Sequence, residues 1–258
     1  MKPMLYHNAM STCSQKVRLA LEEKGVSWES REINLLASEQ KSPEYLAINP
    51  KGVVPALQVG NAIILESTMI NEYIGAHFPG PRLLPVDPES NAAALRWPRK
   101  IDEDVHKAFG TITYGTVMRG FMLQMPRESV IADIEKTTDP VHRELRLSLF
   151  ELGTKAPAFN AAISSLLQFV DDLEAALKNS IWLAGDEFSL ADCAAAPYVL
   201  RLDHLGLDAL WTSGKRPSID AWYGALRSRQ AFDRGVTQWL HDPAISMFRA
   251  AGAQLEIV

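Results

Sequence analysis

Three side chains that can handle an anion or act as nucleophiles stand close together near the N-terminus. The stretch "NAMSTCSQKVRLALEEKG", residues 8 to 25, places Ser11, Cys13 and Ser14 directly before an amphipathic helical pattern. A hydroxyl at a helix start can cap the helix, and the positive end of a helix lowers the pKa of a cysteine thiol. The residue types therefore predict chemistry with an anion at the start of a helix, and they leave open which side chain carries it.

A second group of residues is typical of a site for an extended peptide. Pro55 interrupts "KGVVPALQV", which otherwise has a strand pattern, and proline lacks the N–H that a strand ladder needs. If the Val54–Pro55 bond is cis, the turned backbone of Val54 presents its N–H and C=O to an extended ligand. Glu66 and Ser67 follow at a predicted helix start, where free N–H groups favour a carboxylate and Glu66 can bind an ammonium group. An edge-strand proline and simple helix capping by Ser67 are the alternative interpretations.

The elements that must position these residues alternate in type before residue 80. The patterns predict strands at 4–7 and 28–35, helices at 14–25, 42–50 and 67–78, and a hairpin at 53–66 that turns at Gly60-Asn61. This βαβ-ββα order predicts a small mixed sheet covered by helices.

The second half of the chain has a different character. Strand signals are absent from Pro85 onward, and long helical periodicities follow at 95–109, 159–177, 190–205 and 218–232. The stretch "HFPGPRLLPVDPES" between the halves is too rich in proline for a helix or strand and predicts a linker. We expect an α/β domain at residues 1–79, a linker at 80–87 and an all-α domain at 88–258.

Composition excludes several classes of protein. The chain has 258 residues and a net charge of -5, with no basic cluster of the kind that nucleic-acid binding requires. No stretch has the length and apolarity of a membrane span, and no secretory leader is recognised. We therefore expect a cytoplasmic protein without nucleic-acid or membrane partners, in which Cys13 and Cys193 are free thiols.

Taken together, these features resemble the cytosolic glutathione transferase superfamily, in particular its bacterial β-aryl etherases and tetrachlorohydroquinone reductive dehalogenases. The resemblance rests on the βαβ-ββα order, on proline after Val54, on the "ES" helix start and on the helical second half. "SLAD", at Ser189 to Asp192, matches the capping box of the family's central helix, and "KRPSIDAWYGALRSRQAF" resembles a later helix region. The resemblance implies a thioredoxin-like domain that binds glutathione and a helical domain that binds the second substrate.

Glutathione would then be the co-substrate, and no metal is implied. By resemblance, Glu66 and Ser67 hold the γ-glutamyl ammonium and carboxylate, and Val54, before Pro55, holds the cysteinyl backbone. Lys41 corresponds to the residue that binds the glycyl carboxylate, although a solvated surface lysine is the alternative.

The family resemblance ranks the three candidates near the N-terminus. Ser11 aligns with the serine that donates a hydrogen bond to the glutathione thiolate in several classes, so it is the first choice. Ser14 is a second choice, because the corresponding region of the etherases contacts the thiol, and a cap of the following helix is its alternative role. Cys13 corresponds to the cysteine with which the dehalogenases attack a glutathionyl intermediate, and its alternative is a packed structural cysteine.

A pocket for an aromatic second substrate is expected in the helical half. The connection at 115–157 is longer than bundle connections usually are, and such segments often cover active sites. The predicted pocket residues are His106, Phe109, Tyr114, Met118 and Arg119, with Trp97 and Phe121 beside them. His106 or Tyr114 would donate to a departing phenolate and Arg119 would pair with it. The tail, residues 242–258 with Phe248, either closes over the cleft or frays.

The first hypothesis for the function is cleavage of a β-aryl ether of lignin-derived compounds by a glutathione thiolate. Reductive dehalogenation of chlorinated hydroquinones is an alternative that requires Cys13. Isomerisation of a maleyl compound is another, and a noncatalytic subunit that binds aromatic ligands is a third. The resemblance also implies a homodimer, and a heterodimer is conceivable.

Overall fold

A mixed four-stranded sheet forms the N-terminal part of the protein. The structure, a computed structural model, describes residues 2–255 and 257. The strands are β1 (Met4–His7), β2 (Glu29–Glu32), β3 (Ala56–Val59) and β4 (Ala62–Leu65). Their order in the sheet is β2-β1-β3-β4; β1 is parallel to β2 and antiparallel to β3, and β3 pairs with β4 as a hairpin. Gly60 adopts a positive φ of 60° at the tip of this hairpin, which glycine accommodates without a steric penalty. The predicted sheet is confirmed.

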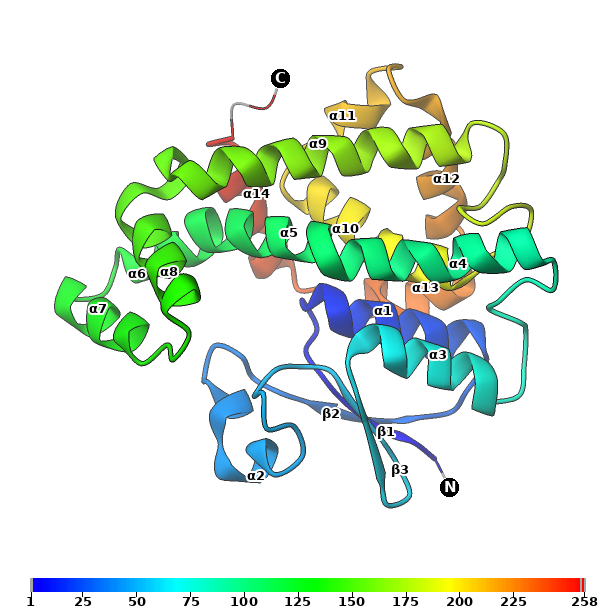
Figure 1. The fold of residues 1–258 in the computed structure, drawn as a ribbon, viewed down its shortest axis with the longest axis horizontal. Coiled ribbons are helices and arrows are strands. Elements are labelled where there is room, and N and C mark those ends of the chain that lie inside the picture. Colours follow the sequence, from blue (N-terminus) through cyan, green and yellow to red (C-terminus); the bar gives the residue numbers. More distant parts are fainter. Residues whose placement is uncertain (1, 256, 258) are drawn as a thin grey trace.

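Helices cover both faces of the sheet (Figure 1). They are α1 (Thr12–Glu23), η1 (Glu39–Lys41), α2 (Pro43–Leu46) and α3 (Ser67–His77). Alternation along β1 separates the two faces: Leu5 belongs to the main core together with Val17 of α1, whereas Tyr6 packs edge-on against Tyr45 of α2. Because α1 also packs against helices of the second half, its N-terminus lies where the two parts of the chain meet.

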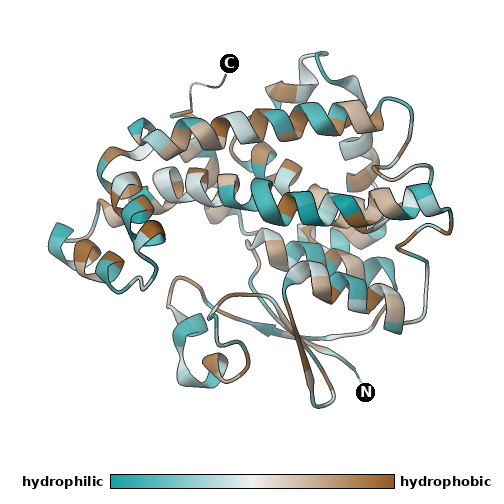
Figure 2. Cartoon of the chain, in the orientation of Figure 1, coloured by the Kyte–Doolittle hydropathy of each residue, from teal (hydrophilic) through white to brown (hydrophobic). Residues whose placement is uncertain are grey.

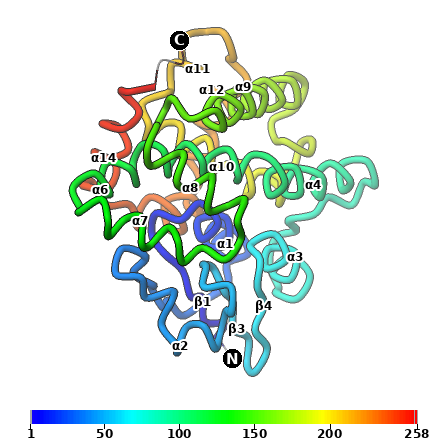
Figure 3. Tube along the Cα trace, turned by 60° about the vertical axis from the view of Figure 1, so that its left-hand side comes forward, coloured from blue at the N-terminus to red at the C-terminus, as the bar shows by residue number. Residues whose placement is uncertain are grey.

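The second half is entirely helical among the described residues, as expected. Residues 78–87 lie in no helix or strand. The elements that follow are α4 (Pro88–Lys100), η2 (Ile101–Val105), α5 (His106–Thr113), η3 (Tyr114–Met118), α6 (Arg119–Met122), α7 (Arg127–Glu135), α8 (Pro140–Leu152), η4 (Gly153–Lys155), α9 (Pro157–Leu177), α10 (Leu190–His204), α11 (Ala209–Thr212), α12 (Pro217–Arg227), α13 (Gln230–Gly235), η5 (Thr237–Trp239) and α14 (Asp242–Gly252). Figure 3 shows α14 close to α6, and α14 packs directly against η3.

The first long helix extends further than the sequence indicates. From α4 to α6 the chain is one helical rod, in which η2 and η3 are wider π-helical turns. Gly115 does not end this rod, because it is a packing position: a Cβ there would lie 3.2 Å from side-chain atoms of Leu149 and Phe159. The connection to α9 therefore begins at Leu123 instead of Gly115, and it contains α7 and α8.

The core of the helical part is built around α10, whose residues are nearly all buried. Ser189 and Asp192 form the predicted capping box at its start. Asp192 also accepts the indole N–H of Trp222 at 2.9 Å, which ties α10 to α12. Figure 2 shows hydrophilic and hydrophobic residues mixed along the outer helices α4, α5 and α9. None of the described helices is both long enough and apolar enough to cross a membrane.

Candidate active site

A cavity of about 440 Å³, here called the polar cavity, lies between the sheet domain and the helical rod. Its lining residues are Ser11, Cys13, Leu35, Gln40, Asn49, Gly52, Val53, Val54, Pro55, Glu66, Ser67, Asp102 and His106. Six of the predicted thiol and glutathione residues therefore meet in one place. They come from the start of α1, the loop before β3 and the start of α3.

The loop before β3 offers unpaired backbone groups to this cavity. The Val54–Pro55 peptide bond is cis. The neighbouring Val53 carbonyl accepts the Tyr45 hydroxyl at 2.8 Å and the Asn49 amide at 2.7 Å, which fixes the loop. Among the described residues, neither the N–H nor the C=O of Val54 has a hydrogen-bond partner. These two groups are free to pair with the backbone of an extended ligand.

The start of α3 provides a site for charged groups. Glu66 precedes the helix with a φ of 66°, an uncommon backbone conformation for a residue with a side chain. Its carboxylate binds Lys51 at 2.7 Å and remains half exposed. Ser67 is the buried first residue of α3, where the free N–H groups and the helix dipole favour a carboxylate. This pair of residues can bind an ammonium group and a carboxylate side by side.

The structure distinguishes the two serines at the start of α1. Ser11 is the N-cap, and its Oγ accepts the backbone N–H of Ser14 at 3.3 Å, so its own hydrogen is free to donate. The Ser14 side chain is fully buried, accepts the backbone N–H of Asn8 at 3.2 Å and lines no cavity of the site. Its position therefore favours a structural role for Ser14 and leaves Ser11 facing the ligand space.

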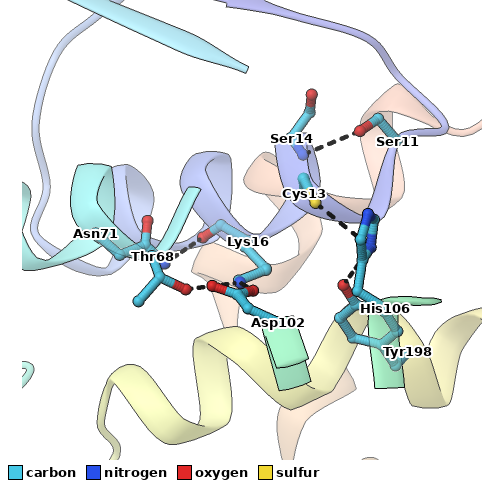
Figure 4. A network of polar contacts seen from close by, with 9 residues as sticks. All are labelled: Ser11, Cys13, Ser14, Lys16, Thr68, Asn71, Asp102, His106 and Tyr198. Carbon is cyan, nitrogen blue, oxygen red and sulfur yellow. Dashed lines mark hydrogen bonds and ion pairs between the residues drawn. The ribbon is translucent and has the colours of Figure 1, made fainter. Parts of the chain in front are cut away.

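Cys13 lies in the first turn of α1 and contacts the helical rod. Its Sγ is 3.8 Å from Nδ1 of His106, and the same nitrogen is 3.0 Å from the hydroxyl of Tyr198 (Figure 4). Burial acts to raise the pKa of the Cys13 thiol, but the hydrogen bond and charge of His106, the charge of Lys16 and a hydrogen bond from Ser67 together bring it below its ordinary value. The pKa of His106 is raised, chiefly through its hydrogen bond with Cys13.

A buried lysine completes this contact between α1 and the rod. The Lys16 ammonium is fully buried, donates to the Thr68 hydroxyl at 3.0 Å and pairs with Asp102 at 2.9 Å (Figure 4). Asn71 donates to the Lys16 carbonyl at 3.2 Å from the neighbouring α3. Separation of Lys16 from Asp102 would leave a buried charge without a partner, which costs free energy. The ion pair therefore fixes the position of η2 against α1.

A second cavity of about 760 Å³, here called the apolar pocket, adjoins the polar cavity. It is lined by Asn8, Ala9, Met10, Ser11, Glu32, Asn34, Leu35, Leu36, Gln40, Thr113, Val117, Met118, Phe121, His241, Ala244, Met247 and Phe248. Ser11, Leu35 and Gln40 line both spaces. The apolar pocket has the size and mainly apolar lining of a site for a small aromatic molecule.

Some of the residues predicted for the aromatic pocket lie elsewhere. Met118 and Phe121 line the apolar pocket, and His106 lines the polar cavity. Phe109 is buried beneath the site against Tyr198, with ring centroids 5.2 Å apart. Trp97 packs against Phe169 in the core.

Two polar candidates are occupied by structural contacts. The Tyr114 hydroxyl accepts a hydrogen bond from Arg146 at 3.1 Å. Arg119 donates to the carbonyl of Phe150 at 2.8 Å and to that of Glu151 at 3.3 Å, which ties α6 to the end of α8. Neither residue lines the apolar pocket, because each side chain turns toward α8.

Lys41 lies at the edge of the polar cavity without lining it. Its ammonium donates to the Lys51 carbonyl at 3.4 Å. It also packs over Gly52, where a Cβ would come within 2.8 Å of the Lys41 Nζ. The adjacent Gln40 lines both cavities and was not recognised in the sequence.

The C-terminal tail supplies one wall of the apolar pocket. His241, Met247 and Phe248 lie at or within α14, and Phe248 is buried against the guanidinium of Arg201, 3.9 Å from its ring centroid. The described part of the tail is therefore helical and forms a wall of the apolar pocket, and residues 256 and 258 lie outside the described residues. No cluster of possible metal ligands is present among the described residues.

Comparisons with known proteins agree with this arrangement. Residues 5–82 match the family model for the glutathione S-transferase N-terminal domain, and residues 123–230 match that for the C-terminal domain. A tetrachloro-p-hydroquinone reductive dehalogenase of Sphingobium chlorophenolicum is 32% identical over 91% of this chain and 96% of its own length. The glutathione S-transferase TCHQD of Arabidopsis thaliana is 30% identical over 92% of this chain and 90% of its own. Among solved structures, the β-etherase LigF of a Sphingobium species matches with a TM-score of 0.80 at 25% identity, covering 91% of this chain and 98% of that chain.

Proposed function

This chain belongs to the glutathione S-transferase family, and on that premise we propose that it joins the sulfur of glutathione to an aromatic electrophile. Glutathione would occupy the polar cavity and the aromatic compound the apolar pocket. The observation that carries the proposal is the position of Ser11, which lines both spaces at the start of α1.

Each of the three parts of glutathione would have a partner in or beside the polar cavity. Glu66 would bind the γ-glutamyl ammonium, in exchange for its contact with Lys51, and Ser67 with the start of α3 would bind the adjacent carboxylate. The free N–H and C=O of Val54 would pair with the cysteinyl backbone. Lys41, at the edge, would reach the glycyl carboxylate only after leaving its carbonyl partner.

Ser11 would stabilise the glutathione thiolate. A thiol with a pKa of about 8.5 is only a few per cent ionised at neutral pH, so a donor at the sulfur increases the reactive fraction. The Ser11 hydroxyl has a free hydrogen and sits at the helix N-terminus, whose dipole also favours the anion.

We propose β-aryl ether cleavage as the reaction. The thiolate attacks the carbon that bears the aryloxide, beside a ketone; the S–C bond forms, the C–O bond breaks, and the electron pair leaves with the phenolate. Such a leaving group needs proximity and orientation more than strong acid catalysis. This suits a pocket whose described lining contains only Glu32 and His241 as ionisable residues, and the similarity to the β-etherase supports the choice.

The experiment is turnover of an α-keto β-aryl ether with glutathione, with products identified by mass. The proposal predicts a glutathionyl thioether and the free phenol in equal amounts, with the rate unaffected by Cys13→Ala. A protein that binds glutathione but forms no thioether would contradict the proposal and favour a noncatalytic binding subunit.

Reductive dehalogenation is the second candidate, favoured by the placement of Cys13 in the polar cavity against His106. The Cys13 thiolate would attack the sulfur of a glutathionyl hydroquinone; an S–S bond forms, and the C–S pair passes to the ring carbon, which takes a proton. A second glutathione would release Cys13 and leave as glutathione disulfide. With a chlorinated hydroquinone, Cys13→Ala would then stop at the glutathionyl conjugate, whereas complete dechlorination by this variant would exclude the role.

The maleyl isomerase alternative is not supported by the lining of the apolar pocket. Its described residues include no lysine or arginine to bind a dicarboxylate. We also propose a homodimer from the family resemblance, a cytoplasmic location from the composition and a domain boundary at residues 80–87 from the proline-rich stretch. Light scattering tests the dimer, cell fractionation the location, and limited proteolysis the boundary.

A further inference from the structure

Two contacts run in parallel between α1 and the helical rod. On α1, Cys13 and Lys16 are three residues apart, and on the rod Asp102 and His106 are four apart. Both spacings place two side chains on one face of a helix. Where the two helices face each other, these side chains therefore form two contacts, one for each residue of α1. Cys13 meets His106 at 3.8 Å, and Lys16 meets Asp102 at 2.9 Å (Figure 4).

We propose that His106 is a positioning residue that holds Cys13 as a thiolate, and that Tyr198 holds the His106 ring in place for this task. The His106 Nδ1 lies within reach of both the Cys13 sulfur and the Tyr198 oxygen, at 3.8 and 3.0 Å. A proton on Nδ1 is therefore shared between a sulfur and an oxygen acceptor. The Nδ1–H group donates to the thiolate, and Tyr198 prevents the ring from turning away.

The surroundings of the pair favour its charged form. Lys16 on α1 brings a fully buried positive charge near the sulfur, and Ser67 on α3 offers a hydroxyl. Asp102 on η2 favours the imidazolium, whereas Lys16 opposes it. Tyr198 on α10 is buried and remains un-ionised, because burial and the nearby Cys13 raise its pKa well above the ordinary value.

The geometry of the rod places His106 in this position. Its backbone N–H bonds to the Ile101 carbonyl, five residues earlier, at the end of the π-helical turn η2. The ion pair between Lys16 and Asp102 joins this same turn to α1, one helical turn before His106. The ion pair between Lys16 and Asp102 therefore fixes the position along the rod at which His106 meets Cys13.

His106 does not take the position expected of a donor to a departing phenolate. Its ring lies in the polar cavity beside the thiol and does not line the apolar pocket, so it is not placed to donate to a departing phenolate. The chemical consequence of a Cys13 thiolate rests on the second candidate function, in which Cys13 attacks a glutathionyl sulfur. The ionisation of Cys13 itself is measured without glutathione or any aromatic substrate, so either proposal can fail alone.

The test is the rate of Cys13 alkylation by iodoacetamide as a function of pH, followed by mass. Cys193 is fully buried and its pKa is raised well above the ordinary value, so it serves as the unreactive internal control. We expect the wild-type midpoint below the value of about 8.5 that is usual for a free cysteine. After unfolding in urea, the midpoint should return to that value.

Variants assign the effect to His106. His106→Asn should move the midpoint upward and slow alkylation at pH 7 by about tenfold, the change that one pKa unit produces. Tyr198→Phe should move it in the same direction by less, and His142→Asn, at an exposed position on α8, should leave it unchanged. Circular dichroism of each variant is the control for correct folding.

Two results would overturn the proposal. One is a wild-type midpoint at or above that of the urea-unfolded chain. The other is a folded His106→Asn variant whose pH profile superimposes on that of the wild type. A wild-type protein that shows the expected pH profile of Cys13 alkylation but does not cleave the aryl ether would count against the proposed function alone.

Discussion

Replacement of Ser11 by alanine tests whether this hydroxyl stabilises the thiolate of bound glutathione. The Ser11 Oγ already accepts the Ser14 N–H at 3.3 Å, so its own hydrogen is available where the two cavities meet. A glutathione thiol with a pKa of about 8.5 is ~3% ionised at pH 7. The reaction rate of the unassisted thiol is limited by this fraction.

The size of the effect follows from one charged hydrogen bond. Such a bond contributes about 1.5–3 kcal/mol, which lowers the pKa of the thiol by about 1–2 units. The thiolate fraction at pH 7 then rises to between about a quarter and four-fifths. The ratio of these fractions to ~3% sets the effect, so we expect Ser11→Ala to lower kcat/KM at pH 7 by about 8- to 25-fold. The loss should shrink above about pH 9, where an unassisted thiol is already ionised.

The assay is the initial rate of ether cleavage against pH for the wild type, Ser11→Ala and Ser14→Ala. Ser14 is the matched control, since its buried side chain lines neither cavity and its Oγ accepts the Asn8 N–H. Ser14→Ala should lower the free energy of unfolding by about 1–3 kcal/mol, because it leaves that N–H without a partner, and should keep the pH profile. An unchanged profile for Ser11→Ala, or an upward shift for Ser14→Ala, would refute the reasoning.

Three further predictions concern stability and substrate binding. A double-mutant cycle with Lys16→Met and Asp102→Asn should give a coupling of at least about 1 kcal/mol in urea unfolding, and additive effects would contradict the ion pair's role. Phe248→Ala should raise KM for the aryl ether by about 3- to 10-fold by removing apolar contact, while calorimetry shows the same glutathione affinity. Burial lowers the pKa of His7 to about 3 and that of His204 to about 4. Since the unfolded chain protonates both near pH 6.5 while the folded one does not, the free energy of unfolding should fall as pH drops from about 6.5 toward 4, by up to about 1.4 kcal/mol per unit for each histidine. Urea unfolding of the wild type, His7→Gln and His204→Gln at several pH values measures these slopes, and equal slopes for all three would contradict the assignment.

Local signals were sufficient to predict the elements that carry the glutathione residues. The hairpin turn at Gly60 and the helix start at Ser67 each depend on neighbours within a few residues. The start of α1 was predicted less well: the sequence pattern begins the helix at Ser14 as its possible cap, whereas α1 begins at Thr12 and Ser11 is the N-cap. Proline in an otherwise regular strand is a local signal too, and it indicated the special loop at Val54. These features brought six of the predicted residues into one cavity, without Ser14 and Lys41.

Contacts between distant parts of the chain could not be predicted from local pattern. Lys16 has the sequence context of an exposed helix residue, yet it is fully buried, because Asp102, 86 residues later, supplies its counter-charge. Tyr114 and Arg119 have residue types suited to a binding pocket, but the direction in which a rod residue points depends on where α8 packs. The π-helical turns further change the direction in which the rod side chains point, and no pattern in the sequence predicts these turns.

Glutathione binding is the central claim, and calorimetric titration of glutathione into the wild type and Ser67→Ala tests it most directly. We expect saturable heat for the wild type and about tenfold or greater loss of affinity for the variant, because a hydrogen bond to the charged γ-glutamyl carboxylate is removed at the start of α3. No heat from the folded wild-type protein at millimolar glutathione would contradict the account.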